Sequence, residues 1–172
     1  MTIQQRLYTM LLGLLCLLPC GGFAMNFTLE SPAFGNKTTI PKQYTCDGAD
    51  QHPTLTWNDP PVGTQSLVLV VDDLDAPHGT WVHWLVFNIP VTVRQLPEGQ
   101  SLPHEALVGL NSWDKKEYGG PCPPSGLHRY MFKLYALDVP LTVNSSVHYS
   151  DIENAMQTHI LAQTTLIGLY SH

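Results

Sequence analysis

Basic side chains are scarce in this chain of 172 residues, which has eight Lys and Arg against fourteen Asp and Glu. Binding to the phosphates of double-stranded nucleic acid needs a basic stripe, and the sequence contains none. We therefore expect no nucleic-acid partner. An anion site remains compatible with the negative total charge, because the field in a small pocket depends on its nearest groups.

Long hydrophobic runs are also lacking. The longest, Met10–Leu18, is about half of the roughly 20 residues that a membrane-spanning helix needs. It follows a single basic residue, Arg6, and precedes the small-x-small sequence Gly22-Phe23-Ala24. This arrangement is typical of a secretory signal peptide, and we expect cleavage after Ala24.

Removal of a signal peptide at residues 1–24 leaves residues 25–172, a suitable length for a single domain. This part has seven basic and fourteen acidic residues, a formal charge of −7 with neutral histidines. We expect a periplasmic or secreted protein that is not integral to the membrane. The sequence does not indicate its oligomeric state.

Cysteine is rare, and two of the four cysteines, Cys16 and Cys20, lie in the predicted signal peptide. An even pair in an exported protein usually forms a disulfide, so we expect one between Cys46 and Cys122. Two free, buried thiols are the alternative. A zinc module of the CxxC or Cys/His type is excluded because neither cysteine has a second one nearby. We expect no cofactor.

Helical periodicity is limited to one segment, and fourteen prolines argue against a helical bundle. Short apolar or alternating runs between Pro/Gly-rich turns predict strands at 27–29, 55–57, 67–71, 81–89, 130–137 and 165–170. The run 67–71 is continuous, as in a strand covered on both faces. A capping-box pattern, Ser150-Asp151-Ile152-Glu153, predicts a helix with an apolar stripe reaching Ile160. The result is a mainly β protein with one short helix.

A Gly-x-Ser-x-Gly nucleophile motif is absent. Instead, groups that bind protons and anions follow or interrupt the predicted strands. Asp73 and Asp75 come directly after one strand, where alternation would send both carboxylates to the same side. His83 lies between tryptophans in the next apolar run. Two neighbouring carboxylates would repel each other, so His83 or His128 is expected beside them.

Several motifs in order resemble the phosphatidylethanolamine-binding protein family, and in particular its bacterial branch of Raf kinase inhibitor-like proteins. The resemblance covers nearly all of residues 25–170. It rests on Ser31-Pro32-Ala33-Phe34, Tyr44–Ala49, Leu55-Thr56-Trp57, Asp73–Pro77, Val82-His83-Trp84, Gly119–Gly126 and Leu127-His128-Arg129-Tyr130. The chain departs from the family at Leu74, where a proline is common, and at His52-Pro53-Thr54, where Ser-Pro-Pro is more usual.

The resemblance implies a β-sandwich of antiparallel or mixed sheets with a small anion pocket at one end. It implies a small anionic ligand, such as phosphate or a phosphoethanolamine-like headgroup, and in some members inhibition of a kinase or serine protease, with no assigned reaction. Because the chain ends shortly after Tyr170, without the extra helix of animal members, we expect an open pocket. The ligand-binding residues implied are Asp73, Asp75, His83, Pro121, His128 and Tyr130.

Two alternatives stay open for the same residues. One is a small hydrolase or lyase in which His83 and His128 act as acid and base and Asp73 orients them. The other is a metal site built from Asp73, Asp75, His83 and His128, which the resemblance does not favour.

Other charged residues are expected to have structural roles. Arg129 should alternate away from His128 and pair with Asp114 or Asp138. The remaining histidines show no metal-ligand spacing and are expected to be surface or packing residues: His52, His78, His104, His148, His159 and His172.

Overall fold

The computed structural model describes residues 26–172, so the predicted signal peptide at residues 1–24 lies outside the described residues. The described chain forms nine strands, one 3-10 helix and one α-helix. In chain order these are β1 Leu29–Glu30, β2 Thr38–Thr39, η1 Lys42–Tyr44, β3 Leu55–Trp57, β4 Ser66–Asp73, β5 Trp81–Pro90, β6 Gln95–Leu96, β7 Leu107–Val108, β8 His128–Leu137, α1 Tyr149–Met156 and β9 Ile160–Tyr170.

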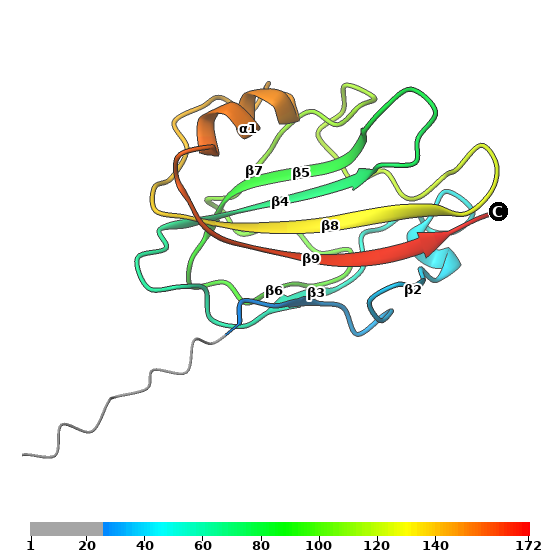
Figure 1. Cartoon of the computed structure of the whole chain (residues 1–172), viewed down its shortest axis with the longest axis horizontal. Helices are drawn as coiled ribbons and strands as arrows, with labels where there is room; N and C mark the ends of the chain where they lie inside the picture. The colour runs from blue at the N-terminus through cyan, green and yellow to red at the C-terminus, as the bar shows by residue number, and fades with distance from the viewer. Residues whose placement is uncertain (1–25) are drawn as a thin grey trace, which may run out of the picture.

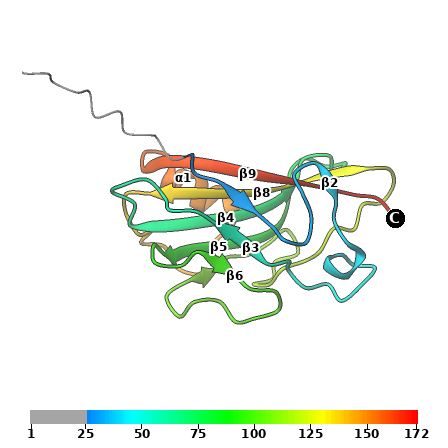
Figure 2. The same ribbon diagram turned by 90° about the horizontal axis from the view of Figure 1, so that it is seen from below.

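The strands form two sheets. The large sheet has the order β2-β9-β8-β4-β5-β7, and the small sheet has the order β1-β3-β6. Among the described strands, β2 and β9 pair in parallel and all other pairs are antiparallel. Figures 1 and 2 show the large sheet between the small sheet and α1. The predicted mainly β sandwich with mixed sheets and one short helix is confirmed.

Strand β4 separates two hydrophobic cores. Leu67, Leu69 and Val71 belong to the core shared with the small sheet, whereas Val68 and Val70 belong to the core under α1. All five side chains are fully buried, which confirms the prediction of a strand covered on both faces. Each contributes about 1.5–3 kcal/mol through burial of its apolar surface.

Two aspartates end β4 and continue this alternation. Asp72 follows Val70 on the α1 face, and Asp73 follows Val71 on the face toward the small sheet. Both are buried, at 0% and 3% exposure. Because a buried carboxylate needs a partner, each face of the sheet must supply one.

Strand β5 has a β-bulge at His83. Trp84 and Val82 pair with the consecutive β4 residues Val71 and Asp72, so His83 has no residue opposite it. Trp84 therefore lies in the core toward the small sheet and Val82 in the core under α1. The extra residue bends the strand and directs its side chain independently of the alternation.

Helix α1 begins one residue before the predicted cap Ser150 and is shorter than predicted. Asp151, rather than Glu153, accepts a hydrogen bond from the backbone N–H of His148 at 3.0 Å, which stabilises the helix start. The eight-residue helix ends at Met156, because the chain then turns into β9. No helix within residues 26–172 has the length and apolarity needed to cross a bilayer.

Candidate functional site

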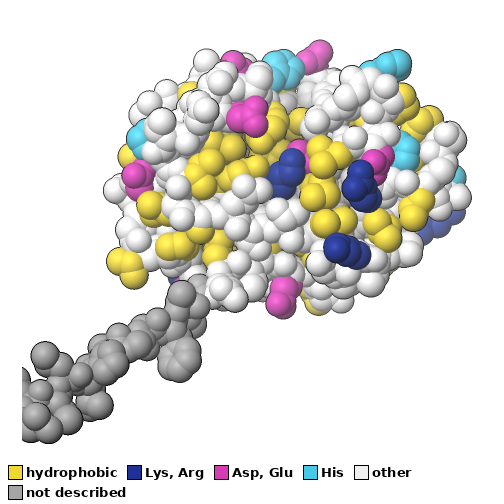
Figure 3. All heavy atoms as spheres, in the orientation of Figure 1, with side chains coloured by type: hydrophobic (Ala, Val, Ile, Leu, Met, Phe, Trp, Pro, Cys, Tyr) yellow, Lys and Arg dark blue, Asp and Glu magenta, His cyan; other side chains and the backbone are white. Residues whose placement is uncertain are grey.

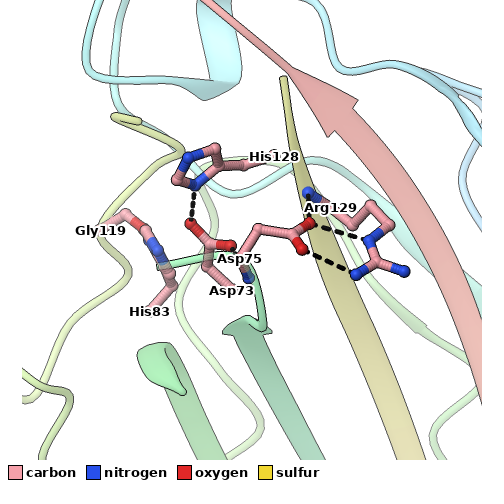
Figure 4. Close-up of polar contacts among 6 residues, drawn as sticks. All are labelled: Asp73, Asp75, His83, Gly119, His128 and Arg129. Carbon is pink, nitrogen blue, oxygen red and sulfur yellow. Dashed lines mark hydrogen bonds and ion pairs between the residues drawn. The ribbon is translucent and has the colours of Figure 1, made fainter. Parts of the chain in front are cut away.

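The ends of three neighbouring strands bring four polar side chains together at one edge of the large sheet. Asp73 ends β4, His83 lies near the start of β5, and His128 begins β8. Tyr130 is opposite Asp73 in the ladder between β4 and β8. Figure 4 shows both imidazole rings close to the Asp73 carboxylate.

His128 and Asp73 form a buried pair. The distance from His128 Nδ1 to Asp73 Oδ2 is 2.7 Å, and the two side chains are 8% and 5% exposed. An ionised carboxylate has no proton to donate, so His128 Nδ1 carries the proton and donates the hydrogen bond to Asp73. The Nε2 atom of His128 is then available to a ligand, as an acceptor in the neutral ring or a donor in the protonated ring.

His83 is held by the loop that precedes Pro121. Its Nδ1 donates to the carbonyl oxygen of Gly119 at 2.7 Å, and the N–H of Gly119 donates to the His83 carbonyl at 3.0 Å. Burial lowers the pKa of His83, although the Gly119 carbonyl and the Asp73 charge oppose this effect. His83 is therefore neutral at neutral pH, and its Nε2 is able to accept a hydrogen bond from a ligand.

Tyr130 is fully buried below His83. Its ring meets the His83 ring edge-on, with centroids 5.2 Å apart. The hydroxyl has no hydrogen-bond partner within residues 26–172. Burial and the nearby Asp73 carboxylate raise its pKa, so the hydroxyl stays protonated. It is thus a buried, unsatisfied donor next to the site, although Tyr130 does not line the cavity.

Asp75 points away from this group. Its carboxylate accepts hydrogen bonds from Arg129 Nε at 2.8 Å and Nη2 at 2.7 Å, as Figure 4 shows. Hydrogen bonding by Arg129 lowers the pKa of Asp75 to about 2. Strand alternation predicted both carboxylates on one side, but β4 ends at Asp73 and the chain turns there, with the Asp75 N–H donating to Asp73 Oδ1 at 2.8 Å. Arg129 thus pairs with Asp75 instead of Asp114 or Asp138.

A cavity of about 380 Å³ opens beside these polar groups. Asp73 and His83 line it, together with apolar walls from Pro77, Trp81, Trp113 and Pro124. Trp113 is 42% exposed and packs edge-on against both Trp81 and His83, with ring centroids 5.3 and 5.1 Å apart. A concave site with a few polar groups in apolar walls is typical of small-ligand sites.

Pro121 does not line the cavity as the resemblance implied. It is buried, and its carbonyl accepts the N–H of Cys46 at 3.1 Å. Its neighbour Cys122 lines the cavity. His78 is exposed, as expected of a surface residue, and also lines the cavity.

Trp113 is the main site residue that the sequence did not reveal. It lies in a loop without strand periodicity or a recognised motif. The side-chain oxygen of Asn111 shapes this loop by accepting the N–H groups of Trp113 and Lys115, both at 3.0 Å. Asn favours turns in which its side chain accepts backbone N–H groups a few residues later, so Asn111 is a weak sequence signal for the turn that carries Trp113.

Two loops are held together beside the cavity. Cys46 and Cys122 are joined through their sulfurs, with Cα atoms 5.5 Å apart. Gly120, in the loop of Cys122, lies close to the loop of Cys46. Its N–H donates to Asp50 Oδ1 at 2.6 Å, and a Cβ at this position would lie 2.7 Å from the Thr45 Cα. A larger residue at position 120 would push the two loops apart.

The geometry does not favour a metal site at the predicted residues. Asp75 is engaged by Arg129, and His83 Nδ1 is engaged by the Gly119 carbonyl. In the described part of the chain, the group of ligand-type atoms within 4.8 Å of one another comes from Cys46, Cys122 and His172, outside this set.

A sandwich of two mostly antiparallel sheets with a small pocket of histidines and an aspartate at one sheet edge defines a class of small-ligand-binding β proteins. The family model described as phosphatidylethanolamine-binding protein matches residues 30–171. The chain belongs to this family.

Curated relatives and solved structures agree with this assignment. A UPF0098 protein of Aquifex aeolicus is 44% identical over 160 residues, covering 90% of this chain and 92% of the relative. One from Methanothermobacter thermautotrophicus is 43% identical over 146 residues, covering 83% of this chain and 97% of the relative. The crystal structure of YbcL from E. coli, described as a member of the mammalian PEBP family, has a TM-score of 0.80 at 31% identity, covering 85% of this chain and 98% of YbcL.

Proposed function

We propose that this protein binds a small ligand through a phosphate or similar oxyanion in the cavity beside Asp73 and His83. The observation that supports this best is the pair of buried imidazoles whose Nδ1 atoms are engaged by protein oxygens. The Nε2 atom of His83, which lines the cavity, is then available to the ligand. His128 does not line the cavity itself, and it adjoins it through the Asp73 carboxylate. Phosphate oxygens accept from a protonated ring, and a phosphate O–H donates to a neutral one.

The walls of the cavity suit an organic group attached to the phosphate. Trp81, Trp113, Pro77 and Pro124 offer apolar surface next to Asp73 and His83. A phosphoethanolamine-like headgroup would place its phosphate toward the imidazoles and its carbon chain along the tryptophans. The family's description as phosphatidylethanolamine-binding supports this class of ligand.

The proposal includes binding rather than catalysis. Among the described residues that line the cavity there is no Ser or Thr, and Cys122 is joined to Cys46. A covalent mechanism would therefore lack a hydroxyl or thiol nucleophile in this cavity. By binding an acidic or phosphorylated group of a partner in this cavity, the protein would inhibit an enzyme of the serine protease or kinase type.

Export completes the proposal. The apolar run and the small residues before Met25 support a periplasmic or secreted location with cleavage after Ala24. The intact mass of the protein recovered from the cell envelope or medium tests this directly. A chain that retains residues 1–24 in the cytoplasm would refute export but leave the ligand proposal standing.

Titration with phosphoethanolamine at about pH 6, followed through the imidazole NMR signals, tests ligand binding. We expect the signals of His83 and His128 to shift, and His128→Ala to abolish binding. His159→Ala is a matched control, because His159 forms a comparable pair with Asp138 at 2.8 Å on the surface. Unchanged signals at millimolar ligand would overturn the proposal. Ester or phosphodiester turnover that is lost in His83→Ala would favour the hydrolase instead.

A further inference from the structure

A second cavity lies on the opposite face of the large sheet, between the sheet and α1. Its volume is about 390 Å³, and it shares no lining residue with the first cavity. Asp72 and Lys133 line it from the strands, and Tyr149 and Glu153 line it from the helix. It is therefore separate from the proposed phosphate site.

Asp72 leaves an unsatisfied acceptor in this cavity. The side chain is fully buried, and Oδ2 accepts a hydrogen bond from Lys133 Nζ at 2.6 Å. Its Oδ1 is buried and has no hydrogen-bond partner in the described part of the chain. Buried carboxylate oxygens are costly when unpaired, so this position calls for a donor.

Two further acceptors lie near Asp72. The Tyr149 hydroxyl donates to Glu153 Oε1 at 3.3 Å and accepts from the Tyr135 hydroxyl at 3.4 Å, so one lone pair of its oxygen is available to a ligand. Burial is the main cause that raises the pKa of Asp72, and repulsion by the Asp73 and Glu153 carboxylates adds to it. Glu153 lines the same cavity as Asp72. The Lys133 ammonium offsets the charge of one of the two carboxylates, Asp72 and Glu153, so a net negative charge of one remains among these three groups.

Several other polar groups of the cavity are already engaged. The Ser112 hydroxyl accepts the N–H of Val82 at 2.9 Å, and the Asn111 amide donates to a backbone carbonyl at 3.0 Å. His148 Nε2 lies 3.4 Å from a carboxylate oxygen of Asp114. The hydroxyls of Ser112, Thr80 and Ser150 can each donate or accept, so the negative charge of Asp72 and Glu153, rather than a shortage of donors, favours a cation.

We propose that this cavity binds a small molecule through a primary ammonium group. An ammonium has three N–H donors, which match Asp72 Oδ1, the Glu153 carboxylate and the Tyr149 oxygen. Its single positive charge balances the remaining negative charge.

The surrounding charge favours the same ligand class. An anion would lie beside two carboxylates, which disfavours it. The positive end of the α1 dipole is offset by Asp151 in the first turn. Figure 3 shows acidic and histidine side chains along the upper edge of the molecule, where Figure 1 places α1.

Binding of n-butylammonium, measured by calorimetry and by the aromatic NMR signals of Tyr149, tests the proposal. We expect binding that shifts the Tyr149 signals, and no binding of tetramethylammonium, which lacks N–H donors. Glu153→Gln and Tyr149→Phe should each weaken binding about tenfold, because the first removes a negative charge and the second an acceptor oxygen, with little change in shape. Glu30→Gln, an exposed residue in the small sheet, is the matched control.

The test separates this site from the phosphate site. His128→Ala should lose binding of inorganic phosphate and keep n-butylammonium binding. Glu153→Gln should keep phosphate binding and weaken n-butylammonium binding. Inorganic phosphate is the probe here because phosphoethanolamine itself carries a primary ammonium group. Equal binding of the two cations would overturn the proposal, as would full affinity in Glu153→Gln. Inorganic phosphate that shifts Tyr149 in place of the amine would overturn it as well.

Discussion

Each face of the large sheet buries one aspartate, but the partner that stabilises the carboxylate differs between the two faces. Asp72 and Asp73 are adjacent in sequence and point to opposite faces, and each is buried with one cationic or ionisable partner. Asp72 is paired with Lys133 at 2.6 Å and Asp73 with His128 at 2.7 Å. One strand end thus supplies a carboxylate to two separate cavities.

The partner decides how each carboxylate behaves. A lysine ammonium stays charged across the physiological pH range, whereas an imidazole is the side chain that changes its charge there. The face toward α1 therefore holds an ion pair with a lysine, and the face toward the small sheet holds two imidazoles, one of which, His83, has its pKa lowered by burial. We expect the first to matter more for stability and the second for the pH dependence of binding.

Lys133→Met should have the largest effect, because it leaves the Asp72 carboxylate buried without a counterion. We expect the free energy of unfolding to fall by about 3–5 kcal/mol in urea denaturation. Lys115→Met is the control: Lys115 pairs with Glu117, and the two side chains are 64% and 60% exposed, so its loss should cost less than about 1 kcal/mol. The double variant Asp72→Leu/Lys133→Met should recover most of the stability. A Lys133→Met protein as stable as the wild type would show that the ion pair is not the stabilising feature of this face.

The double variant Cys46→Ser/Cys122→Ser should have the next largest effect. A crosslink between residues 76 positions apart contributes about 4 kcal/mol in the chain-entropy model, and it lies beside the first cavity only. We expect lower stability and weaker phosphoethanolamine binding, with n-butylammonium binding unchanged. Reductant should reproduce these changes in the wild type. A wild-type mass that does not rise by two protons on reduction would mean that the disulfide is absent.

The pH dependence of binding should differ between the two cavities. Burial holds the pKa of His83 below 6.5, so its ring becomes charged and attracts phosphate only as the pH falls below that value. We expect phosphoethanolamine affinity to rise about tenfold as pH falls, and His83→Gln to flatten this profile. n-Butylammonium affinity should fall instead, because burial raises the pKa of Asp72 and acid therefore removes the negative charge that binds the amine. Parallel profiles measured by calorimetry would contradict the comparison.

The same shift predicts a stability effect of opposite sign. The unfolded chain binds a proton at His83 near pH 6.5, whereas the folded chain binds it only at lower pH. Folded protein without ligand should therefore lose stability as pH falls from 6.5 toward the lowered pKa. His83→Gln should remove this part of the pH dependence of the melting temperature.

The smallest effect is expected for Asp75→Asn. Arg129 lowers the pKa of Asp75 to about 2, so the pair stabilises the fold above the unfolded value of 3.8 and is lost as pH falls toward 2. Because the Arg129 side chain is 58% exposed, the free energy of unfolding at neutral pH should fall by less than about 1 kcal/mol. A larger loss in urea denaturation would place Asp75 among the groups that hold the site together.

Local patterns in the sequence predicted much of the fold. The apolar run 67–71 indicated a strand buried on both faces, and Asp73 at its end was placed at the sheet edge. The same alternation failed at Asp75, because it holds only while the strand continues. Helix α1 was predicted too long, since apolar spacing alone does not show where a chain leaves a helix for a strand.

The parts that could not be predicted depend on contacts between distant segments. At His83, β5 has one residue more than β4 between two paired positions. This bulge depends on the pairing of the two strands, and no local sequence pattern indicates it. Trp113 and His78 reach the cavity through loops whose courses are set by tertiary contacts. The lysine partner of Asp72 lies 61 positions away and follows only from strand register.

The bulge has a consequence for how binding is built into this fold. Without His83, Trp84 and Val82 would still be paired with Val71 and Asp72, and both cores would keep their side chains in phase. The pairing between β4 and β5 therefore does not need His83, which is an extra residue between two positions that are already paired. The fold and the proposed binding site therefore depend on different residues at this point. A chain that lacks only His83 should fold as before, without an imidazole in the cavity wall.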